Sequence, residues 1–356
     1  MPRPIRATFD LAAFRENLAL TRVRAPHART WAVVKANAYG HGLERAVRAL
    51  EAADGFALLD LDDAVRLREA GVTKPILLLE GVFEADDLQV VGEHGLAIVV
   101  HDDEQIALLE AVRLPARVPV YLKLNSGMNR LGFPPERYRH VFERLARSPV
   151  VAGITLMTHF ADADGPSGVA EQLHRFEVAA ARIEAPRSLA NSAAILRFPD
   201  THFDCVRPGI MLYGCSPFPD ESAQALGLKP VMTLSAELIA VRDLRAGDRV
   251  GYGGAFVAER PMRLGVVACG YADGYPRHAP TGTPILVNGI RTRTVGRVSM
   301  DMLTVDLDPV PGAAPGTPVT LWGEGLPCDE VAAAAGTLSY ELLCKITARV
   351  PQIDRA

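Results

Sequence analysis

The sequence predicts an α/β protein of two domains, an N-terminal (β/α)8 TIM-type barrel followed by a mainly β C-terminal domain. Three observations predict it. At 356 residues the chain is longer than one hydrophobic core usually serves. Short apolar runs alternate with amphipathic stretches between about residues 30 and 206, and longer alternating runs follow after residue 224. We therefore expect residues 1–223 to form the barrel and residues 224–356 the β domain.

Eight short runs rich in Leu and β-branched residues are the candidate barrel strands. Near-continuous apolar runs are typical of strands covered on both faces, and stretches between them such as DLDDAVRLREAG are typical of amphipathic crossover helices. Strands joined in this way run parallel, and eight of them can close into a barrel. The runs lie at residues 30–35, 55–60, 75–80, 96–102, 119–125, 153–160, 187–192 and 203–209.

Longer runs of alternating polar and apolar residues predict the second, mainly β domain. Asn288-Gly289 gives the strongest local signal, because this dipeptide favours the type I′ turn of a β-hairpin. A helix is expected at about residues 329–335, leading into SYELLCKI. The candidate strand segments are VMTLSAELIAV, RVGYGGAF, RLGVVACGY, TPILVNGIRTRTVG, VSMDMLTVDL and TPVTLWG.

The composition favours a small molecule as partner and gives no reason to expect nucleic acid or membrane. The chain has 38 basic and 42 acidic residues without a long run of either sign. No stretch approaches the roughly 20 apolar residues of a membrane span, and MPRPIRATFDL lacks the apolar segment of a signal peptide, so we expect a cytoplasmic protein. Five scattered cysteines without CxxC or zinc-ligand spacing argue against a disulfide framework and against a metal site.

Polar residues at the C-terminal ends of the predicted barrel strands are the candidate site residues. Such barrels keep their active sites at this face, whereas the strand interiors are packed. For Asp60, Glu80 and His101, the alternative is that they are ordinary polar residues at the start of a solvent-exposed loop and have no role in a site. The strand ends carry, in order, Lys35, Asp60, Glu80, His101, Lys123 with Asn125, His159, Asn191 with Ser192, and Arg207.

Two features of this face match the chemical groups of one cofactor. Lys35 ends an apolar run, and partial burial there would lower the pKa of its ammonium group, as a Schiff-base lysine requires. A salt-bridged or snorkelling lysine is the alternative. Ser192 and the turn at Gly209 follow the last two strands, where such barrels commonly bind phosphate. A lysine for an aldehyde and a cradle for a phosphate suit pyridoxal 5′-phosphate.

Nine strings along nearly the whole chain resemble, in order, those of the bacterial alanine racemase family. They are AVVKANAYGHG, LKLNSGMNRLG, MTHFADAD, ANSAA, RPGIMLYG, GYGGAF, GYADGYPR, GRVSMDM and SYELLCKI. The resemblance implies a pyridoxal-phosphate-dependent isomerase that interconverts L-alanine and D-alanine. It also implies a homodimer, because each active site would take residues from both subunits.

The resemblance implies a role for each cofactor and catalytic residue. Lys35 would hold the cofactor and serve one face of the substrate Cα, and Tyr252 of the partner subunit would serve the other, since racemisation needs an acid-base group on each face. Arg207 would face the pyridine nitrogen, His159 would also bind the cofactor, and these two residues are the candidates for lowering the pKa of Tyr252 from its usual value of about 10. The phosphate would be held by Tyr39, Ser192, Gly209, Ile210 and Tyr340.

Substrate binding is implied in the same way. Arg130 would steady the phenolate and the substrate carboxylate, and the backbone amide of Met300 would bind that carboxylate. Tyr271 would narrow the entrance from the partner subunit, and Asp301 would shape the same wall. Lys123 is expected to be carbamylated and to buttress Arg130, although the sequence itself offers only a lysine near an arginine.

Three other functions remain as alternatives. A racemase of broader substrate range, or one that prefers serine, is the nearest alternative. A decarboxylase of this architecture would place an acidic residue at the ring nitrogen, where RPGI offers Arg207. A non-catalytic pyridoxal-phosphate carrier would lack the β domain and Tyr252. The sequence does not distinguish a biosynthetic enzyme, which supplies D-alanine as a peptidoglycan precursor, from a catabolic one.

Overall fold

A computed structural model describes residues 3–355 of the chain. Its internal contacts divide the chain into two compact units. The barrel unit consists of Leu18–Ala38 and Leu43–Leu212, and the β unit consists of the chain up to Asn17, Tyr39–Gly42 and the chain from Tyr213 onward. Each unit is described separately below.

Eight parallel strands close into a barrel, which confirms the fold class predicted from the alternating apolar runs. Each strand pairs with the next, and β2 pairs with β9 to complete the ring, with Arg29 opposite Cys205. The strands are β2 (Arg29–Val33), β3 (Gly55–Leu58), β4 (Ile76–Leu78), β5 (Ala97–Val100), β6 (Val118–Lys123), β7 (Val151–Met157), β8 (Arg187–Ser188) and β9 (Cys205–Val206).

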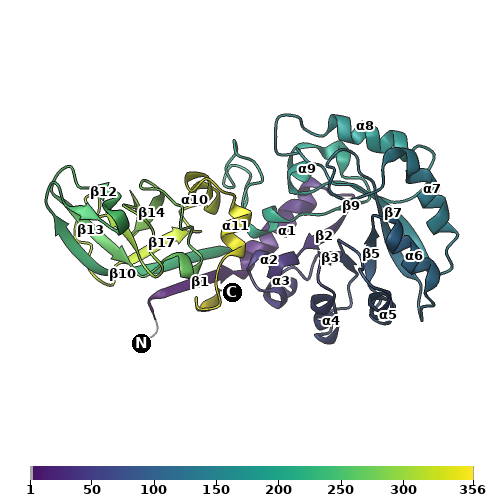
Figure 1. Ribbon diagram of the computed structural model, residues 1–356, viewed down its shortest axis with the longest axis horizontal. Coiled ribbons are helices and arrows are strands. Elements are labelled where there is room, and N and C mark those ends of the chain that lie inside the picture. Colours follow the sequence, from purple (N-terminus) through teal and green to yellow (C-terminus); the bar gives the residue numbers. More distant parts are fainter. Residues whose placement is uncertain (1–2, 356) are drawn as a thin grey trace. The chain divides into compact units, whose positions relative to one another are not determined.

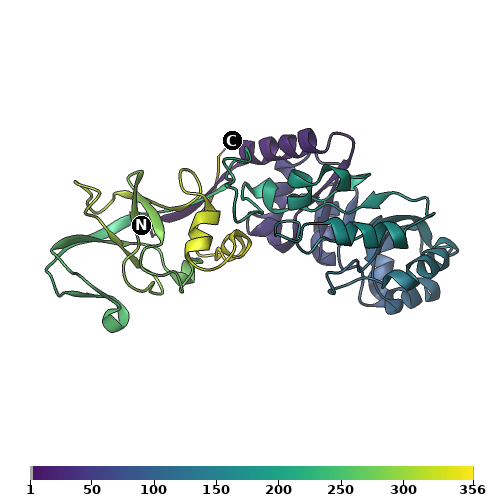
Figure 2. The same cartoon turned by 90° about the horizontal axis from the view of Figure 1, so that it is seen from above.

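Helices surround the ring of strands, as Figures 1 and 2 show from two directions. In α4 (Leu61–Glu69), Ala64 and Leu67 are buried, while acidic residues in the first turn and basic residues in the last complement the helix dipole. The other helical segments are α1 (Leu11–Arg24), α2 (Lys35–Tyr39), α3 (Leu43–Ala49), α5 (Ala85–Glu93), α6 (Asp103–Ala111), α7 (Pro135–Ala146), α8 (Ala170–Ala179), α9 (Ser192–Arg197), η1 (Pro199–Thr201) and η2 (Ile210–Tyr213).

The β unit is built around the long strand β10 (Met232–Leu244). Strand β10 pairs with β1, β17 and β13, and its buried residues Leu234, Ala236 and Leu238 alternate with more exposed ones. The other strands are β1 (Ile5–Asp10), β11 (Arg249–Val250), β12 (Phe256–Val257), β13 (Met262–Val267), β14 (Pro284–Val287), β15 (Ile290–Arg293), β16 (Leu303–Asp306), β17 (Pro318–Trp322) and β18 (Gln352–Arg355).

The predicted hairpin and terminal helix are both present. Asn288 and Gly289 join β14 to β15 with φ values of 50° and 75°, the left-handed conformation that a type I′ turn requires at both positions. Helix α10 (Cys328–Ala334) lies within one residue of the expected bounds. A further helix, α11 (Ser339–Cys344), forms in SYELLCKI, and two short 3-10 turns are η3 (Tyr252–Gly254) and η4 (Tyr271–Asp273).

The first strand and the last were not predicted, and they pair with each other. Strand β1 runs antiparallel to β10, and both are labelled in Figure 1. It also pairs in parallel with β18. The contacts therefore place the N-terminal residues in the β unit, whereas the sequence predicts one boundary between residues 223 and 224. The reason is that β1 is held by partners more than 200 residues away in the chain, so no local pattern reveals its place.

Within residues 3–355, no helix has the length and apolar character that crossing a bilayer requires. The same residues contain no cluster of three or more His, Cys, Asp or Glu that could hold a metal ion. All five cysteines are free thiols, four of them buried and Cys344 exposed.

Candidate active site

Lys35 lies two residues after the end of β2 and begins a turn of unusual backbone conformation. The next four residues, Ala36 to Tyr39, have φ values of 53°, 52°, 52° and 51°. A left-handed conformation costs a non-glycine residue about 1–2 kcal/mol, and such strain persists where the surrounding structure enforces it, often at functional sites. Two hydrogen bonds hold the turn, from Ala38 N–H to Val34 O at 2.9 Å and from Leu43 N–H to Asn37 Oδ1 at 2.9 Å.

The end of this turn lies against α11 in the β unit. Gly40 has φ 75°, and a Cβ atom there would lie 2.2 Å from the carbonyl oxygen of Leu343, so only glycine fits. Tyr39 stacks on Tyr213 with ring centroids 4.5 Å apart, and the ring of Tyr340 lies 6.0 Å away. Burial raises the pKa of Tyr39, which keeps its hydroxyl protonated as a donor. Two predicted phosphate residues, Tyr39 and Tyr340, are thus neighbours.

The other predicted phosphate residues meet in the barrel unit, after β8 and β9. Ser192 is the first residue of α9, and its Oγ accepts hydrogen bonds from the N–H groups of Gly209 at 2.8 Å and Met211 at 3.4 Å. Ile210 begins η2, and amides at a helix start have no partner within the helix. The five phosphate residues therefore form two groups, one in each unit, and the barrel group lies where such barrels commonly bind phosphate.

Arg207 is buried beside this corner and held by four hydrogen bonds. Its Nη1 donates to Ser188 O at 2.6 Å and to Ser188 Oγ at 2.7 Å, and its Nη2 donates to Thr158 O at 2.7 Å and Leu189 O at 3.2 Å. Burial lowers the pKa of Arg207 to about 10, so the guanidinium stays charged at neutral pH. Nε makes no hydrogen bond to any described residue and is the nitrogen left for a ligand.

Positive side chains gather at the ends of β6 and β7. Burial, together with the charges of Arg207 and Arg130, lowers the pKa of Lys123 to about 8, although Glu80 acts in the opposite direction. Burial likewise lowers the pKa of His159 well below its usual value, assisted by Arg207 and Lys123, so its ring is neutral near pH 7. Lys123, Arg130 and His159 also line one hollow. The structure thus brings these predicted residues together.

Gln172 in α8 supports this cluster and was not predicted. Its Nε2 donates to Ser126 Oγ at 3.1 Å and to His159 O at 3.3 Å, and its Oε1 accepts from Ala161 N–H at 2.7 Å. It therefore ties the segment before Arg130 to the segment that carries His159. A glutamine within an amphipathic helix carries no sequence signal for such a role.

Of the other strand-end candidates, Glu80 and His101 lie close together. The ring Nε2 of His101 is 3.1 Å from Glu80 O, and Gln105 Nε2 donates to the same oxygen at 2.8 Å. Asp60 is the N-cap residue of α4 without a side-chain capping bond. These contacts hold the loops after the strands, and only Glu80 acts electrostatically on a predicted site residue, Lys123.

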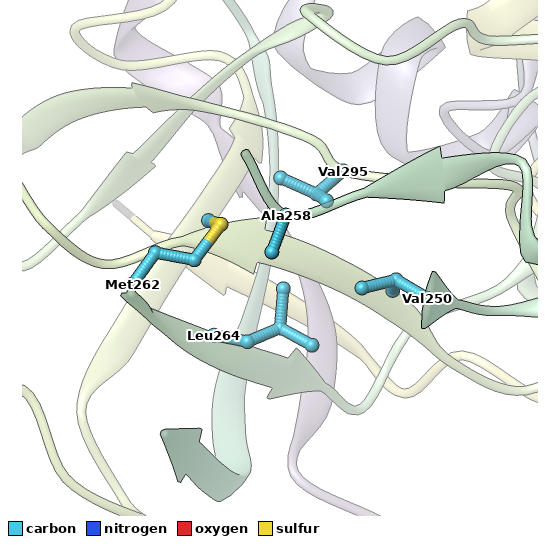
Figure 3. Packing of buried hydrophobic residues seen from close by; sticks show 5 residues of the cluster. All are labelled: Val250, Ala258, Met262, Leu264 and Val295. Atoms are coloured by element: carbon cyan, nitrogen blue, oxygen red, sulfur yellow. The ribbon is translucent and has the colours of Figure 1, made fainter. Parts of the chain in front are cut away.

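Tyr252 lies in the loop of a short hairpin of the β unit, and its side chain is exposed to solvent. It begins η3, between β11 and β12, and is 72% exposed. Figure 3 shows the apolar cluster that anchors the hairpin, formed by Val250, Ala258, Met262, Leu264 and Val295. Because the cluster holds the base of the hairpin, the exposed ring is presented from a supported loop.

Tyr271 and Met300 lie on two adjacent loops of the β unit. Tyr271 N–H donates to Ser299 O at 3.0 Å, and Ala272 N–H donates to Met300 O at 2.9 Å. Met300 is 53% exposed, and its backbone N–H donates to no described residue. This amide is therefore available to a ligand, as the sequence comparison implies.

Known proteins resemble this chain over its whole length. The model of the alanine racemase N-terminal domain matches residues 9–217, and that of the C-terminal domain matches residues 231–354. The alanine racemase of Nitrosospira multiformis is 59% identical over 99% of this chain and all of its own length. That of Paraburkholderia phytofirmans is 57% identical over 99% of each chain.

Solved structures of alanine racemases have the same fold as this chain. The biosynthetic alanine racemase from Pseudomonas aeruginosa is 50% identical, with a TM-score of 0.97 over 99% of this chain and 100% of that one. The alanine racemase from Acinetobacter baumannii is 38% identical, with a TM-score of 0.92 over 99% of this chain and 100% of that one. On both the sequence and the fold, the chain belongs to the alanine racemase family.

Proposed function

We propose that this chain is a pyridoxal-phosphate-dependent racemase that interconverts L-alanine and D-alanine. Membership of the family supports the reaction and the substrate. The observation that carries the proposal is the set of groups at one end of the barrel: a lysine after β2, an amide cradle after β8 and β9, and a buried arginine beside it.

The residues present fit pyridoxal 5′-phosphate. Lys35 offers an amine for the aldehyde. The Ser192 hydroxyl and the Ile210 N–H, next to the turn at Gly209, offer donors for the phosphate, and Arg207 Nε offers a donor for the ring nitrogen. When bound, the cofactor withdraws electrons from the substrate Cα. Because Arg207 keeps its own proton, the ring remains a weaker electron sink, which favours reprotonation of Cα over transamination.

Two acid-base groups on opposite faces of Cα are needed to invert it. We assign Lys35 Nζ to one face and Tyr252 Oη of the partner subunit to the other. The exposure of Tyr252 supports this assignment, because a ring that is 72% exposed on a supported hairpin can enter the site of a second copy. The active form is then a homodimer whose two sites each need both chains.

Substrate binding follows from the remaining groups. We assign the substrate carboxylate to Arg130 and to the free N–H of Met300, and we place Tyr271 at the entrance. Lys123 is suited to carbamylation because its pKa of about 8 leaves a fraction of neutral amine near pH 7.5. That amine adds to CO2 and releases one proton, and the charges of Arg130 and Arg207 would stabilise the product. A native mass in bicarbonate buffer without an added carboxyl group would contradict this step.

The test is an absorbance spectrum of the purified protein, followed by circular dichroism of L-alanine incubated with it. A yellow protein that erases the optical activity of alanine is expected. A yellow protein that racemises serine and leaves alanine unchanged would favour the alternative serine racemase. A protein that stays colourless with added cofactor would contradict the proposal.

Tyr252→Phe separates a racemase from a cofactor carrier. The variant should keep the yellow absorbance, because Tyr252 is not assigned to the cofactor, and should lose turnover by a factor of at least about 100, the usual contribution of a general acid-base group. Undiminished turnover would remove Tyr252 from the mechanism. Full activity per subunit in an isolated monomer would contradict the shared site. The cytoplasmic location and the choice between biosynthetic and catabolic roles stay predictions.

A further inference from the structure

A buried carboxylate, Asp273, holds the loop that carries Tyr271. Its side chain has no exposed surface and accepts four hydrogen bonds: from Arg3 Nη1 at 2.7 Å, Arg3 Nη2 at 3.2 Å, Arg349 Nε at 2.7 Å and Gly270 N–H at 2.9 Å. Burial alone would raise the pKa of Asp273, but the bonds from Arg3 and Arg349 outweigh it and lower the pKa. The carboxylate is therefore ionised at neutral pH.

The same two arginines reach the loop that carries Met300. Arg3 Nη2 donates to Asp301 O at 2.6 Å, and Arg349 Nη2 donates to Asp301 Oδ1 at 2.6 Å. Each arginine therefore bridges Asp273 and Asp301, and Asp301 is the residue after Met300. Arg3 and Arg349 come from opposite ends of the chain, so the two loops are joined through residues that neither loop contains.

The loop of Tyr271 is also packed against the segment that carries Arg349. Thr347 Oγ1 donates to Ala272 O at 2.8 Å, and a Cβ atom on Gly274, which has φ 113°, would lie 2.5 Å from Lys345 O. Two backbone hydrogen bonds join the loop of Tyr271 directly to the loop of Met300, from Tyr271 N–H to Ser299 O at 3.0 Å and from Ala272 N–H to Met300 O at 2.9 Å. Within the described residues, the side-chain hydrogen bonds that reach the loop of Met300 are those of Arg3 and Arg349 to Asp301.

We propose that Arg3 and Arg349 are positioning residues that, through Asp273, fix the loop of Met300 and so aim its free N–H at the substrate carboxylate. This inference rests on the proposed function, in which that N–H binds the carboxylate. A single N–H group binds well only within a narrow range of angles, so a loop that moves by a fraction of an ångström loses much of the bond. Neither arginine needs to touch the substrate.

The test compares Arg3→Ala and Arg349→Ala with the control Arg355→Ala. Arg355 lies in the same unit and also pairs with two carboxylates, Asp10 at 2.6 Å and Glu324 at 3.0 Å, neither of which belongs to these loops. Loss of the aimed hydrogen bond should raise the KM for alanine roughly tenfold, with a smaller change in kcat. The control should keep the KM of the wild type. Arg349→Lys, which can keep one ion pair without bridging, should give an intermediate KM.

Hydrogen exchange provides a readout that does not depend on activity. Amides of residues 270–274 and 299–302 should exchange faster in Arg3→Ala and Arg349→Ala than in the wild type and in the control. The proposal would be overturned if Arg3→Ala and Arg349→Ala were both active with the KM of the wild type. It would also be overturned if these amides exchanged as fast in Arg355→Ala as in the two variants. If the wild type failed to racemise alanine, the proposed function would fail, and the exchange comparison would still decide whether the arginines hold the loops.

Discussion

Replacement of Gly40 by alanine tests whether the close approach of the turn after Lys35 to α11 is a structural requirement. The added methyl carbon would lie 2.2 Å from the carbonyl oxygen of Leu343. An ordinary carbon–oxygen contact is roughly 3.3 Å, so the two backbones must separate by about 1 Å. The substitution also forces an alanine to adopt φ 75°.

These two effects can be given magnitudes. A left-handed alanine costs about 1–2 kcal/mol, and overpacking of this kind costs about 1–3 kcal/mol more. Gly336→Ala is the matched control, because Gly336 lies in the same unit with φ 70° and no atom within 4 Å of the position of the added carbon. The control should therefore lose only the first amount, and Gly40→Ala should lose about 2–5 kcal/mol in total.

The assay is urea unfolding of both variants and the wild type, followed by far-ultraviolet circular dichroism. Cofactor titration followed by absorbance should in addition show weaker binding in Gly40→Ala, because displacement of the turn moves Tyr39 away from Tyr340. Equal losses of stability in the two variants would refute the close approach. Full stability together with full cofactor affinity in Gly40→Ala would refute the role of the turn.

Two further predictions concern the barrel end. The first is Lys123→Met in bicarbonate-free buffer. The pKa of Lys123 is about 8 in the folded chain, below its ordinary value of 10.5, so between these pH values the unfolded chain binds more protons, and the wild type should gain stability over the variant as the pH rises from about 8 to 10.5. A difference in urea midpoint between wild type and variant that is the same at pH 7.5 and at pH 9.5 would contradict this. The second is Arg207→Lys. An ammonium group cannot reproduce the four hydrogen bonds to Ser188, Thr158 and Leu189, so the free energy of unfolding should fall by about 2–3 kcal/mol, whereas Ser188→Ala, which removes one of these bonds, should lower it by about 1 kcal/mol. Thermal or urea unfolding measures both variants, and a larger loss for Ser188→Ala would contradict the expected order.

Local sequence patterns determined most of the fold. The eight apolar runs became β2 to β9 because strands covered on both faces have to be apolar throughout, and Asn288-Gly289 became a hairpin turn because these residue types tolerate positive φ. The strand ends also indicated the face on which Lys35, Lys123, His159 and Arg207 meet, since parallel strands of a barrel present their C-terminal ends together.

Other features depended on contacts between distant parts of the chain. Strands β1 and β18 pair across the two ends of the sequence, so neither has a neighbour in the chain that would mark it as a strand. The left-handed turn from Ala36 to Tyr39 opposes local propensity and exists because its surroundings enforce it. Gln172 gave no signal for a similar reason, since its three partners lie on two loops, Ser126 after β6 and His159 with Ala161 after β7.

The sequence by itself therefore determined the family and the barrel and indicated candidate residues for the chemistry, because these depend on residue types in a fixed order. Only the tertiary structure decided how those residues are held. Arg3 and Arg349 are ordinary charged residues in the sequence, and they acquire a common role only when the folded β unit places both beside the buried Asp273. A hydrogen bond between residues about 270 positions apart has no local pattern, because it is created by the fold.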